Sequence, residues 1–403
     1  MLLTGDDVRT ARAVLTRFDA VRYTSLEHSR ALSERLGGDV FLKCENMQRT
    51  GSFKLRGAFV RIAGLSSEER SRGVVAASAG NHAQGVALAS SLLGTTATVF
   101  MPVTVSLPKL AATRGYGAEV HLVGFTVEES LAAAHEHART TGAVLIHPFD
   151  HRDVIAGQGT VGLEIAEQCP QARTVLVCTG GGGLLSGVAV AVREALPEAR
   201  VYGVQAAGAA AWPPSLAAGR PVAPDTLQTL ADGIAVGRPG GIPFEHVQAL
   251  VEDVVTVTDE DISRALLMLL ERSKLLVEPA GAAAAAAVLA GTRDWQPPVV
   301  VTLSGGNIDP LVLTRVLQHG LAVAERYLRF VVRVPDEPGT LATLLRRIAE
   351  QDVNVLEIEH RRSHEQLRLN EAAVSLTVEA RGPEHAAAVL AALREAGYGV
   401  VRE

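Results

Sequence analysis

Residues 48–57 read Gln48-Arg49-Thr50-Gly51-Ser52-Phe53-Lys54-Leu55-Arg56-Gly57, four residues after a short apolar run at 40–43 that is typical of a strand. Lys54 stands between Phe53 and Leu55. A lysine amine attacks an aldehyde only when it is neutral, and its ordinary pKa is about 10.4. Apolar neighbours and burial favour the neutral form. Two interpretations follow: a surface cation at a helix start, or a lysine that forms a Schiff base.

Composition limits the class of protein. The chain has 403 residues, 47% hydrophobic and 20% charged, which suits two or three globular domains. A net charge of −6 argues against a nucleic-acid partner. Cys44, Cys169 and Cys178 show no metal-ligand spacing and cannot all pair, which fits a reducing compartment. Without a signal peptide or a long apolar run, we expect a cytoplasmic protein with no membrane partner.

Strands and helices alternate through the first three quarters of the chain, which predicts parallel sheets covered by helices. We expect strands at 40–43, 74–77, 98–101, 120–123, 144–146, 175–177, 201–204 and 299–303. We expect helices at 8–18, 29–36, 81–93, 108–116, 126–140, 158–168, 183–195, 259–271, 281–289 and 311–328.

The rhythm changes from Phe330 onward. The remaining segment reads strand, helix, strand, strand, helix, strand, which is the ferredoxin-like order. The expected strands are at 330–334, 353–359, 373–378 and 398–401, and the expected helices are at 341–351 and 384–396.

A glycine-rich stretch follows the apolar run at 175–177 and opens a helix: Thr179-Gly180-Gly181-Gly182-Gly183-Leu184. It could be a flexible loop. A strand-to-helix junction without side chains is also a good anion site, because helix-start N–H groups face the ligand. The stretch matches neither the dinucleotide fingerprint nor the lysine-containing phosphate loop, so it indicates the phosphate of a smaller cofactor.

Two further stretches follow expected strands. Asn81, in Ser78-Ala79-Gly80-Asn81-His82, could cap a helix or donate to a ring oxygen of a bound cofactor. Ser304, in Ser304-Gly305-Gly306-Asn307, could cap a turn or face a ring nitrogen.

Together these stretches resemble threonine dehydratase (threonine ammonia-lyase), a member of the fold type II, tryptophan-synthase-β-like pyridoxal phosphate enzymes. The similarity lies in residues 43–58, 78–87, 147–164, 180–184, 278–281 and 304–307. Residues 330–403 resemble an ACT domain, a small amino-acid-sensing module. The resemblance implies an α/β catalytic unit at 1–325, with a smaller subdomain at about 52–150 inserted in the larger one. An α+β ACT domain would occupy 328–403.

The resemblance also assigns the site. It implies that Lys54 holds pyridoxal 5'-phosphate as a Schiff base, that Asn81 binds the ring hydroxyl and that Ser304 faces the pyridine nitrogen. Glu278 would lie near the ring, without an assigned role. The other implied cofactor residues are Phe53, Gly180, Gly181, Gly182, Gly183 and Leu184, and the implied substrate-binding residues are Ser78, Ala79, Gly80, Asn81 and His82.

The implied reaction is β-elimination of L-threonine to 2-oxobutanoate and ammonia, with L-serine to pyruvate as a secondary activity. It would serve isoleucine synthesis or threonine breakdown. An amino-acid effector is expected near 336–339 and Asn354, and the enzyme is expected to be a homotetramer. Relatives with a divalent-metal site carry acidic residues just after the strand that ends here at Val204. In this chain residues 205–208, Gln205 to Gly208, supply no carboxylate, so we expect no metal.

Two alternatives stay open. One is a serine racemase or serine dehydratase, and the other is a pyridoxal phosphate-binding amino-acid sensor without catalysis. Racemisation needs a proton donor on the ring face opposite Lys54. In the related racemases that donor is a serine in the position of Ala79, and a methyl group cannot transfer a proton.

Overall fold

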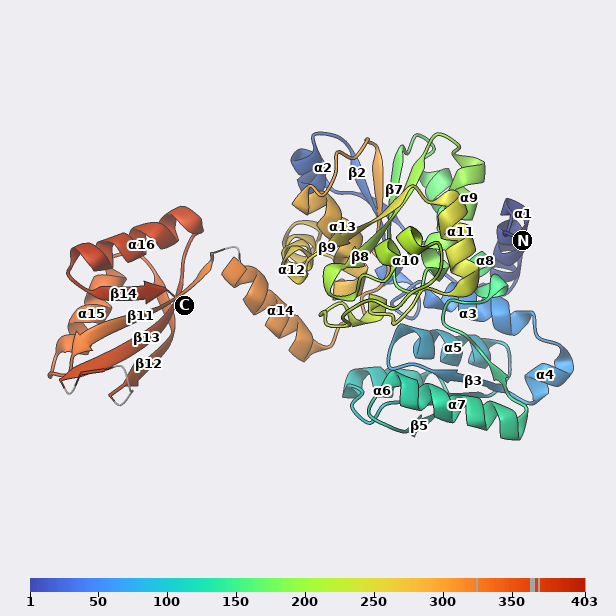
Figure 1. Ribbon diagram of the computed structural model, residues 1–403, viewed down its shortest axis with the longest axis horizontal. Coiled ribbons are helices and arrows are strands. Elements are labelled where there is room, and N and C mark those ends of the chain that lie inside the picture. Colours follow the sequence, from blue (N-terminus) through green and yellow to red (C-terminus); the bar gives the residue numbers. More distant parts are fainter. Residues whose placement is uncertain (324, 363–366, 369, 403) are drawn as a thin grey trace. The chain divides into compact units, whose positions relative to one another are not determined.

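The computed structural model describes residues 1–323, 325–362, 367–368 and 370–402 (Figure 1). Its contacts divide the chain into two compact units, Met1–Val312 and Leu313–Glu403. This division falls within helix α14 (Pro310–Val323). The domain boundaries expected at 325 and 328 stay a prediction.

The larger sheet of the first unit has six strands, in the order β1-β2-β10-β7-β8-β9. Only β1 is antiparallel to its neighbour; the other pairs are parallel. Successive side chains of a strand point to opposite faces. Val175 and Val177 of β7 pack with α9 (Gly183–Ala195), whereas the Cys178 thiol reaches the Gly281 carbonyl of α13 (Pro279–Ala290). Helices therefore cover both faces of this sheet. Its strands are β1 (Leu26–His28), β2 (Val40–Lys43), β7 (Thr174–Cys178), β8 (Arg200–Ala206), β9 (Asp253–Val257) and β10 (Val299–Thr302).

A second, fully parallel sheet has the order β5-β4-β3-β6. Ala76 and Val99 pack with α5 (Asn81–Leu92) on one face, and Val75 packs with Ala134 of α7 (Val127–Thr141) on the other. Figure 1 shows these helices against the sheet. The strands are β3 (Val74–Ala77), β4 (Ala97–Met101), β5 (Glu119–Leu122) and β6 (Val144–Leu145).

Three helices connect the two sheets by close backbone contact. A Cβ on Gly157 of α8 (Arg152–Gln168) would lie 2.6 Å from the Cα of Gly57 in α3 (Lys54–Ala63). A Cβ on Gly187 of α9 would lie 2.5 Å from the backbone nitrogen of Gly159. Glycine at these crossings lets the helix backbones touch, which fixes the start of α3 relative to the larger sheet.

The second unit has the expected ferredoxin-like order of elements. Its antiparallel sheet runs β12-β13-β11-β14, and α15 and α16 complete its core. The elements are β11 (Tyr327–Pro335), α15 (Thr340–Ala349), β12 (Asn354–Arg361), β13 (Glu371–Glu379), α16 (Pro383–Glu395) and β14 (Gly399–Arg402).

One expected helix is too long. The sequence predicts a helix to Leu328, but α14 ends at Val323 and β11 begins at Tyr327, paired with Glu379. Leu328 is buried and starts the alternation that continues at Phe330 and Val332. From Tyr327 onward every second side chain is buried against the sheet, and this pairing outweighs the helical pattern of the local sequence.

The first unit also contains elements that the sequence did not indicate: β1, α4 (Ser67–Ser71), α10 (Trp212–Ala218), α11 (Gly241–Leu250), β9 and the first six residues of α8. The remaining helices are α1 (Gly5–Arg17), α2 (Arg30–Leu36), α6 (Leu107–Gly115) and α12 (Asp259–Met268). None of the helices in the described ranges has the length and apolar character needed to span a membrane.

Candidate active site

A pocket of about 430 Å³ lies in the first unit, where the carboxyl ends of β3 and β7 and the segment after β10 meet. Parallel α/β sheets bind ligands at this end of their strands. Every residue that the sequence suggested for cofactor or substrate lines this one pocket: Phe53, Lys54, Ser78, Ala79, Gly80, Asn81, His82, Gly180, Gly181, Gly182, Gly183, Leu184 and Ser304.

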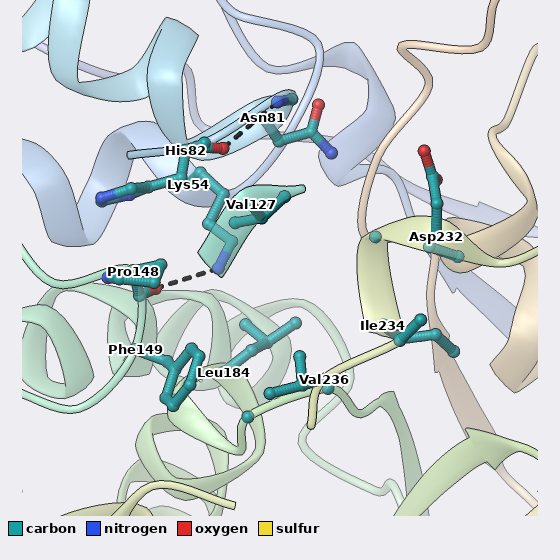
Figure 2. Close-up of a pocket in the computed structure, with 18 of the residues that line it drawn as sticks. Lys54, Asn81, His82, Val127, Pro148, Phe149, Leu184, Asp232, Ile234 and Val236 are labelled. Carbon is teal, nitrogen blue, oxygen red and sulfur yellow. Dashed lines mark hydrogen bonds between the residues drawn. The ribbon is translucent and has the colours of Figure 1, made fainter. Parts of the chain in front are cut away.

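Lys54 is the first residue of α3, and its side chain points into the pocket (Figure 2). Its Nζ donates to the backbone oxygen of Pro148 at 2.9 Å and lies 5.1 Å from the Phe53 ring centroid. Burial lowers the pKa of Lys54 to about 8, against an opposing attraction from Glu278. A useful fraction of the amine is therefore neutral at physiological pH, as nucleophilic or base chemistry requires.

The loop before Lys54 is held by the turn after β10. The backbone N–H of Phe53 donates to the backbone oxygen of Ser304 at 3.2 Å, and the N–H of Gly306 donates to the backbone oxygen of Gly51 at 2.8 Å. Ser52 and Gly305 form an isolated antiparallel bridge. These contacts bring the lysine stretch and the Ser304 stretch together, although 250 residues separate Lys54 from Ser304.

The glycine stretch turns from β7 into α9. Gly182 has a φ of +99°, which favours glycine, and a Cβ there would lie 2.4 Å from the Trp212 ring. A Cβ on Gly181 would meet the Phe149 ring at 2.5 Å. Among the described residues, none accepts a hydrogen bond from the N–H groups of residues 181–184. The helix N-terminus therefore presents free donors and a positive dipole end to an anion.

The sequence left two roles open for Asn81, and the first of them, the cap of α5, is wrong. Gly80 occupies the cap position, and Asn81 is the first helical residue. The Asn81 Nδ2 donates to Glu278 Oε1 at 2.6 Å, and its Oδ1 accepts from Asn307 Nδ2 at 2.8 Å. The amide is thus held at the pocket wall by partners from two distant segments.

Glu278 is 5% exposed and precedes α13 without using its side chain to cap that helix. Burial raises the pKa of Glu278 to about 7, and the Asp232 carboxylate adds to the shift. The hydrogen bond from Asn81 and the charges of Lys109 and Lys54 act in the opposite direction. Glu278 can therefore exchange a proton near neutral pH.

The loop between β3 and α5 supplies a second set of donors. Ser78 turns back on its own loop, where its Oγ accepts from the Gly80 N–H at 3.1 Å. The ring of His82 is buried, with Nε2 2.7 Å from the Ile146 oxygen, and burial lowers its pKa to about 3. His82 is therefore neutral at physiological pH. Among the described residues, no acceptor pairs with the N–H groups of Asn81 and His82.

Sequence reasoning missed the wall opposite Lys54. Residues 232–237 line it, with Leu184, Ile234 and Val236 on this side of the pocket (Figure 2). Asp232 also accepts from Lys109 Nζ of α6 at 2.9 Å, which links this segment to the smaller sheet. The available signal was the run of glycine, alanine and proline around 231–243, which matches no periodic pattern.

Four charged side chains are buried together on α3, on α8 and at the end of β2. Arg56 donates to Glu45 at 2.8 Å and to Glu164 at 2.6 Å, and Lys43 donates to Glu164 at 2.6 Å. Burial alone would lower the pKa of Arg56, but the two carboxylates outweigh it and raise it. Two cations face two anions, so the cluster is electrically balanced.

Among the residues that the structure describes, no three or more His, Cys, Asp or Glu side chains form a group that could hold a metal ion. Gln205 is buried, and its Oε1 accepts from the backbone N–H of Trp212 at 2.9 Å, so this side chain has a structural contact. The three cysteines are buried and unpaired.

Comparison with known families assigns the two units. Residues 17–305 match the family model described as pyridoxal-phosphate dependent enzyme. The chain belongs to this family. Residues 328–397 match the ACT domain model. The predicted fold class and cofactor are thereby confirmed.

The similarity to known proteins covers most of the chain. L-threonine ammonia-lyase from Thermotoga maritima is 44% identical over 99% of both chains, and the protein of that name from Geobacter sulfurreducens is 46% identical over 94% of both. The structure of threonine deaminase isoform 2 from Solanum lycopersicum has a TM-score of 0.74 at 36% identity, covering 79% of this chain and 94% of that one. Maize serine racemase also has a TM-score of 0.74, at 34% identity, covering 80% and 99%.

The residues of the pocket fit pyridoxal phosphate. The cofactor's aldehyde needs a neutral amine, its phosphate needs donors without blocking side chains, and its ring needs a largely apolar slot. Lys54, the free N–H groups of residues 181–184, and Phe53 with Leu184 provide these features in one pocket. Added Cβ atoms on Gly181 and Gly182 would overlap Phe149 and Trp212, so this cradle depends on glycine.

The pKa of Lys54 yields a testable pH dependence. Because the amine must lose its proton to react, we expect the cofactor-free protein to take up pyridoxal phosphate faster as pH rises, with a midpoint near 8. Stopped-flow absorbance would measure this rate. Glu278→Gln removes a charge that raises the pKa of Lys54, so its midpoint should move to lower pH. A wild-type midpoint near the ordinary value of about 10.4 would contradict this assignment.

Proposed function

We propose that this chain is a threonine ammonia-lyase that converts L-threonine to 2-oxobutanoate and ammonia. The observation that carries the proposal is similarity along 99% of both chains to a protein named L-threonine ammonia-lyase. L-Serine would give pyruvate as a secondary activity. In the net reaction, the amino acid loses water from its α- and β-carbons, and the resulting enamine becomes an imine that water hydrolyses.

Lys54 would move the proton that starts the reaction. Pyridoxal phosphate, when bound, supplies the electron sink that makes the α-proton of an amino acid acidic. The Lys54 amine, with its pKa lowered to about 8, is a base matched to neutral pH. The Pro148 oxygen, 2.9 Å from Nζ, orients this amine without supplying a negative charge.

Backbone donors would hold the two anionic groups. The N–H groups at the start of α9 would bind the cofactor phosphate, and those of Asn81 and His82 at the start of α5 would bind the substrate carboxylate. Asn81 would donate to the ring oxygen, and the Ser304 hydroxyl would face the ring nitrogen. A hydroxyl there tolerates an unprotonated ring, which suffices when a β-hydroxyl can depart.

The ACT domain would regulate this activity. We propose that an amino acid binds near the turn at 336–339, where α15 begins after Gly339 with a φ of +92°, and near Asn354 at the start of β12. ACT domains bind amino acids at domain-domain interfaces, and such an interface implies a homo-oligomer, which we propose is a tetramer.

The central prediction concerns Lys54. Lys54→Ala should lower 2-oxobutanoate formation from L-threonine by at least about 10²-fold, since it removes the general base. It should also remove the visible absorbance of the lysine-bound cofactor. Its melting temperature without cofactor should stay close to that of the wild type, because this side chain lies in a pocket and not in the packed core. Wild-type protein that binds the cofactor but leaves threonine unchanged would refute the function.

Ala79 separates the lyase from the racemase. Its methyl group lines the pocket, and the neighbouring Ser78 hydroxyl accepts from the Gly80 N–H within the same loop. The wild type should therefore form little D-serine from L-serine. Ala79→Ser should raise the ratio of D-serine to pyruvate at least about tenfold, because it adds a proton donor. Chiral chromatography measures this ratio, and rapid D-serine formation by wild type would favour the racemase.

The ACT proposal predicts a response to a free amino acid. Isoleucine or valine should change the rate of 2-oxobutanoate formation or the melting temperature of the full-length protein, whereas truncation after Tyr327 should keep activity and remove the response. If no amino acid changes either quantity in the full chain, sensing is refuted and an assembly role remains.

A further inference from the structure

A chain of hydrogen bonds runs behind the pocket from the lysine stretch to Glu278. Asn307 Nδ2 donates to the Thr50 backbone oxygen at 2.7 Å and to Asn81 Oδ1 at 2.8 Å. Asn81 Nδ2 then donates to Glu278 Oε1 at 2.6 Å. Asn81 and Glu278 line the pocket, while Asn307 lies outside the set of described residues that line it.

The direction of this chain is fixed at the Thr50 end, and it is fixed at the other end whenever Glu278 is ionised. A backbone carbonyl only accepts, so the Thr50 oxygen requires the NH₂ end of the Asn307 amide. An ionised Glu278 also only accepts, so it requires the NH₂ end of Asn81. If the Asn81 amide turned over, its NH₂ would face the NH₂ of Asn307 and its oxygen would face the carboxylate. Both hydrogen bonds would be replaced by repulsive contacts.

Two glycines allow the chain to close this tightly. Gly51 has a φ of +71°, and a Cβ there would lie 2.4 Å from Asn307 Oδ1. A Cβ on Gly305 would lie 2.2 Å from Glu278 Oε1 and 3.1 Å from Asn81 Nδ2. The backbone therefore approaches both ends of the chain as closely as a residue without a side chain permits.

We propose that Asn307 is a positioning residue that, together with Glu278, clamps the Asn81 amide so that its NH₂ group faces the cofactor. One hydrogen of that NH₂ is used by Glu278, which leaves the other for an acceptor in the pocket. A phenolic oxygen that has lost its proton is such an acceptor, and the opposite amide orientation would repel it. The inference rests on the proposed contact of Asn81 with the ring oxygen.

A matched pair of variants tests the clamp. Asn307→Ala removes the donor to Asn81. Asn46→Ala is the control, because Asn46 is a buried amide beside the same turn, 3.2 Å from where a Cβ on Gly306 would lie, and donates to the Leu276 oxygen at 3.0 Å. Titration of the cofactor-free full-length proteins would give the dissociation constant of pyridoxal phosphate, and the visible absorbance maximum would report the environment of its ring.

We expect Asn307→Ala to weaken cofactor binding roughly tenfold, the factor that one hydrogen bond of this kind contributes, and to shift the absorbance maximum. Asn46→Ala should keep the maximum and change the dissociation constant less than about twofold. Asn307→Asp, which keeps the shape but not the donor, provides a second variant if the alanine protein folds poorly. Equal effects of Asn307→Ala and Asn46→Ala would overturn the proposal.

A double variant identifies the route of the effect. If Asn307 acts through Asn81, then Asn81→Ala with Asn307→Ala should bind the cofactor about as well as Asn81→Ala alone. Additive losses would overturn the clamp. An Asn81→Ala protein with unchanged affinity and absorbance would refute the Asn81 contact and the clamp with it. Normal cofactor binding by a wild type that is inactive on threonine would instead refute only the proposed reaction.

Discussion

Arg56 is buried between Glu45 and Glu164, and these ion pairs determine where α3 can begin. Removing one partner of a buried pair leaves an unpaired charge and typically costs about 3–5 kcal/mol. Glu45 follows β2 and Glu164 belongs to α8, so the pairs tie three elements together. Lys54 lies two residues before Arg56 and is placed by the same constraint. The ion pairs thus hold an amine of lowered pKa at the pocket wall without contacting it.

The two basic residues on this turn have opposite environments for a physical reason. Arg56 has two carboxylate partners, and their attraction raises its pKa despite burial. Among the hydrogen bonds of the described residues, Lys54 Nζ donates only to the backbone oxygen of Pro148, and burial lowers the pKa of Lys54 to about 8. A carboxylate bonded directly to Lys54 would hold its proton and remove its use as a base. The fold therefore places the strong ion pairs on the far side of the turn.

The sequence predicted the residues of the pocket better than it predicted the helices, strands and contacts around them. Lys54, Asn81 and Ser304 were identifiable because each stands in a short motif that follows a strand, and the structure brings these motifs to one pocket. The roles of the individual residues remain proposals. Glu278 was expected near the ring, but its contact with Asn81 was not, because a bond across 197 residues leaves no local pattern.

The failures have identifiable causes. The end of α14 was misplaced because Tyr327 and Leu328 fit a helical pattern locally, whereas pairing of β11 with β13 decides their conformation. The first turns of α8 were missed because Gly157 resembles a helix breaker, although it is the contact point with Gly57. The segment at 232–237 carries no periodicity at all. For α14 and α8 the conformation is determined by a contact with a residue distant in sequence, which a short stretch of sequence cannot show.

The proposed binding of anions by backbone N–H groups has a consequence for proton transfer. Burial lowers the pKa of Lys54 to about 8 and raises the pKa of Glu278 to about 7, so both pKa values move toward neutral pH. If side-chain cations held the phosphate and the carboxylate, their charge would lower the pKa of Lys54 further and that of Glu278 as well. Helix N-termini provide partial positive charge that falls off within one turn. A pocket of this kind can attract two anionic groups while its carboxyl group and its amine keep pKa values of about 7 and about 8.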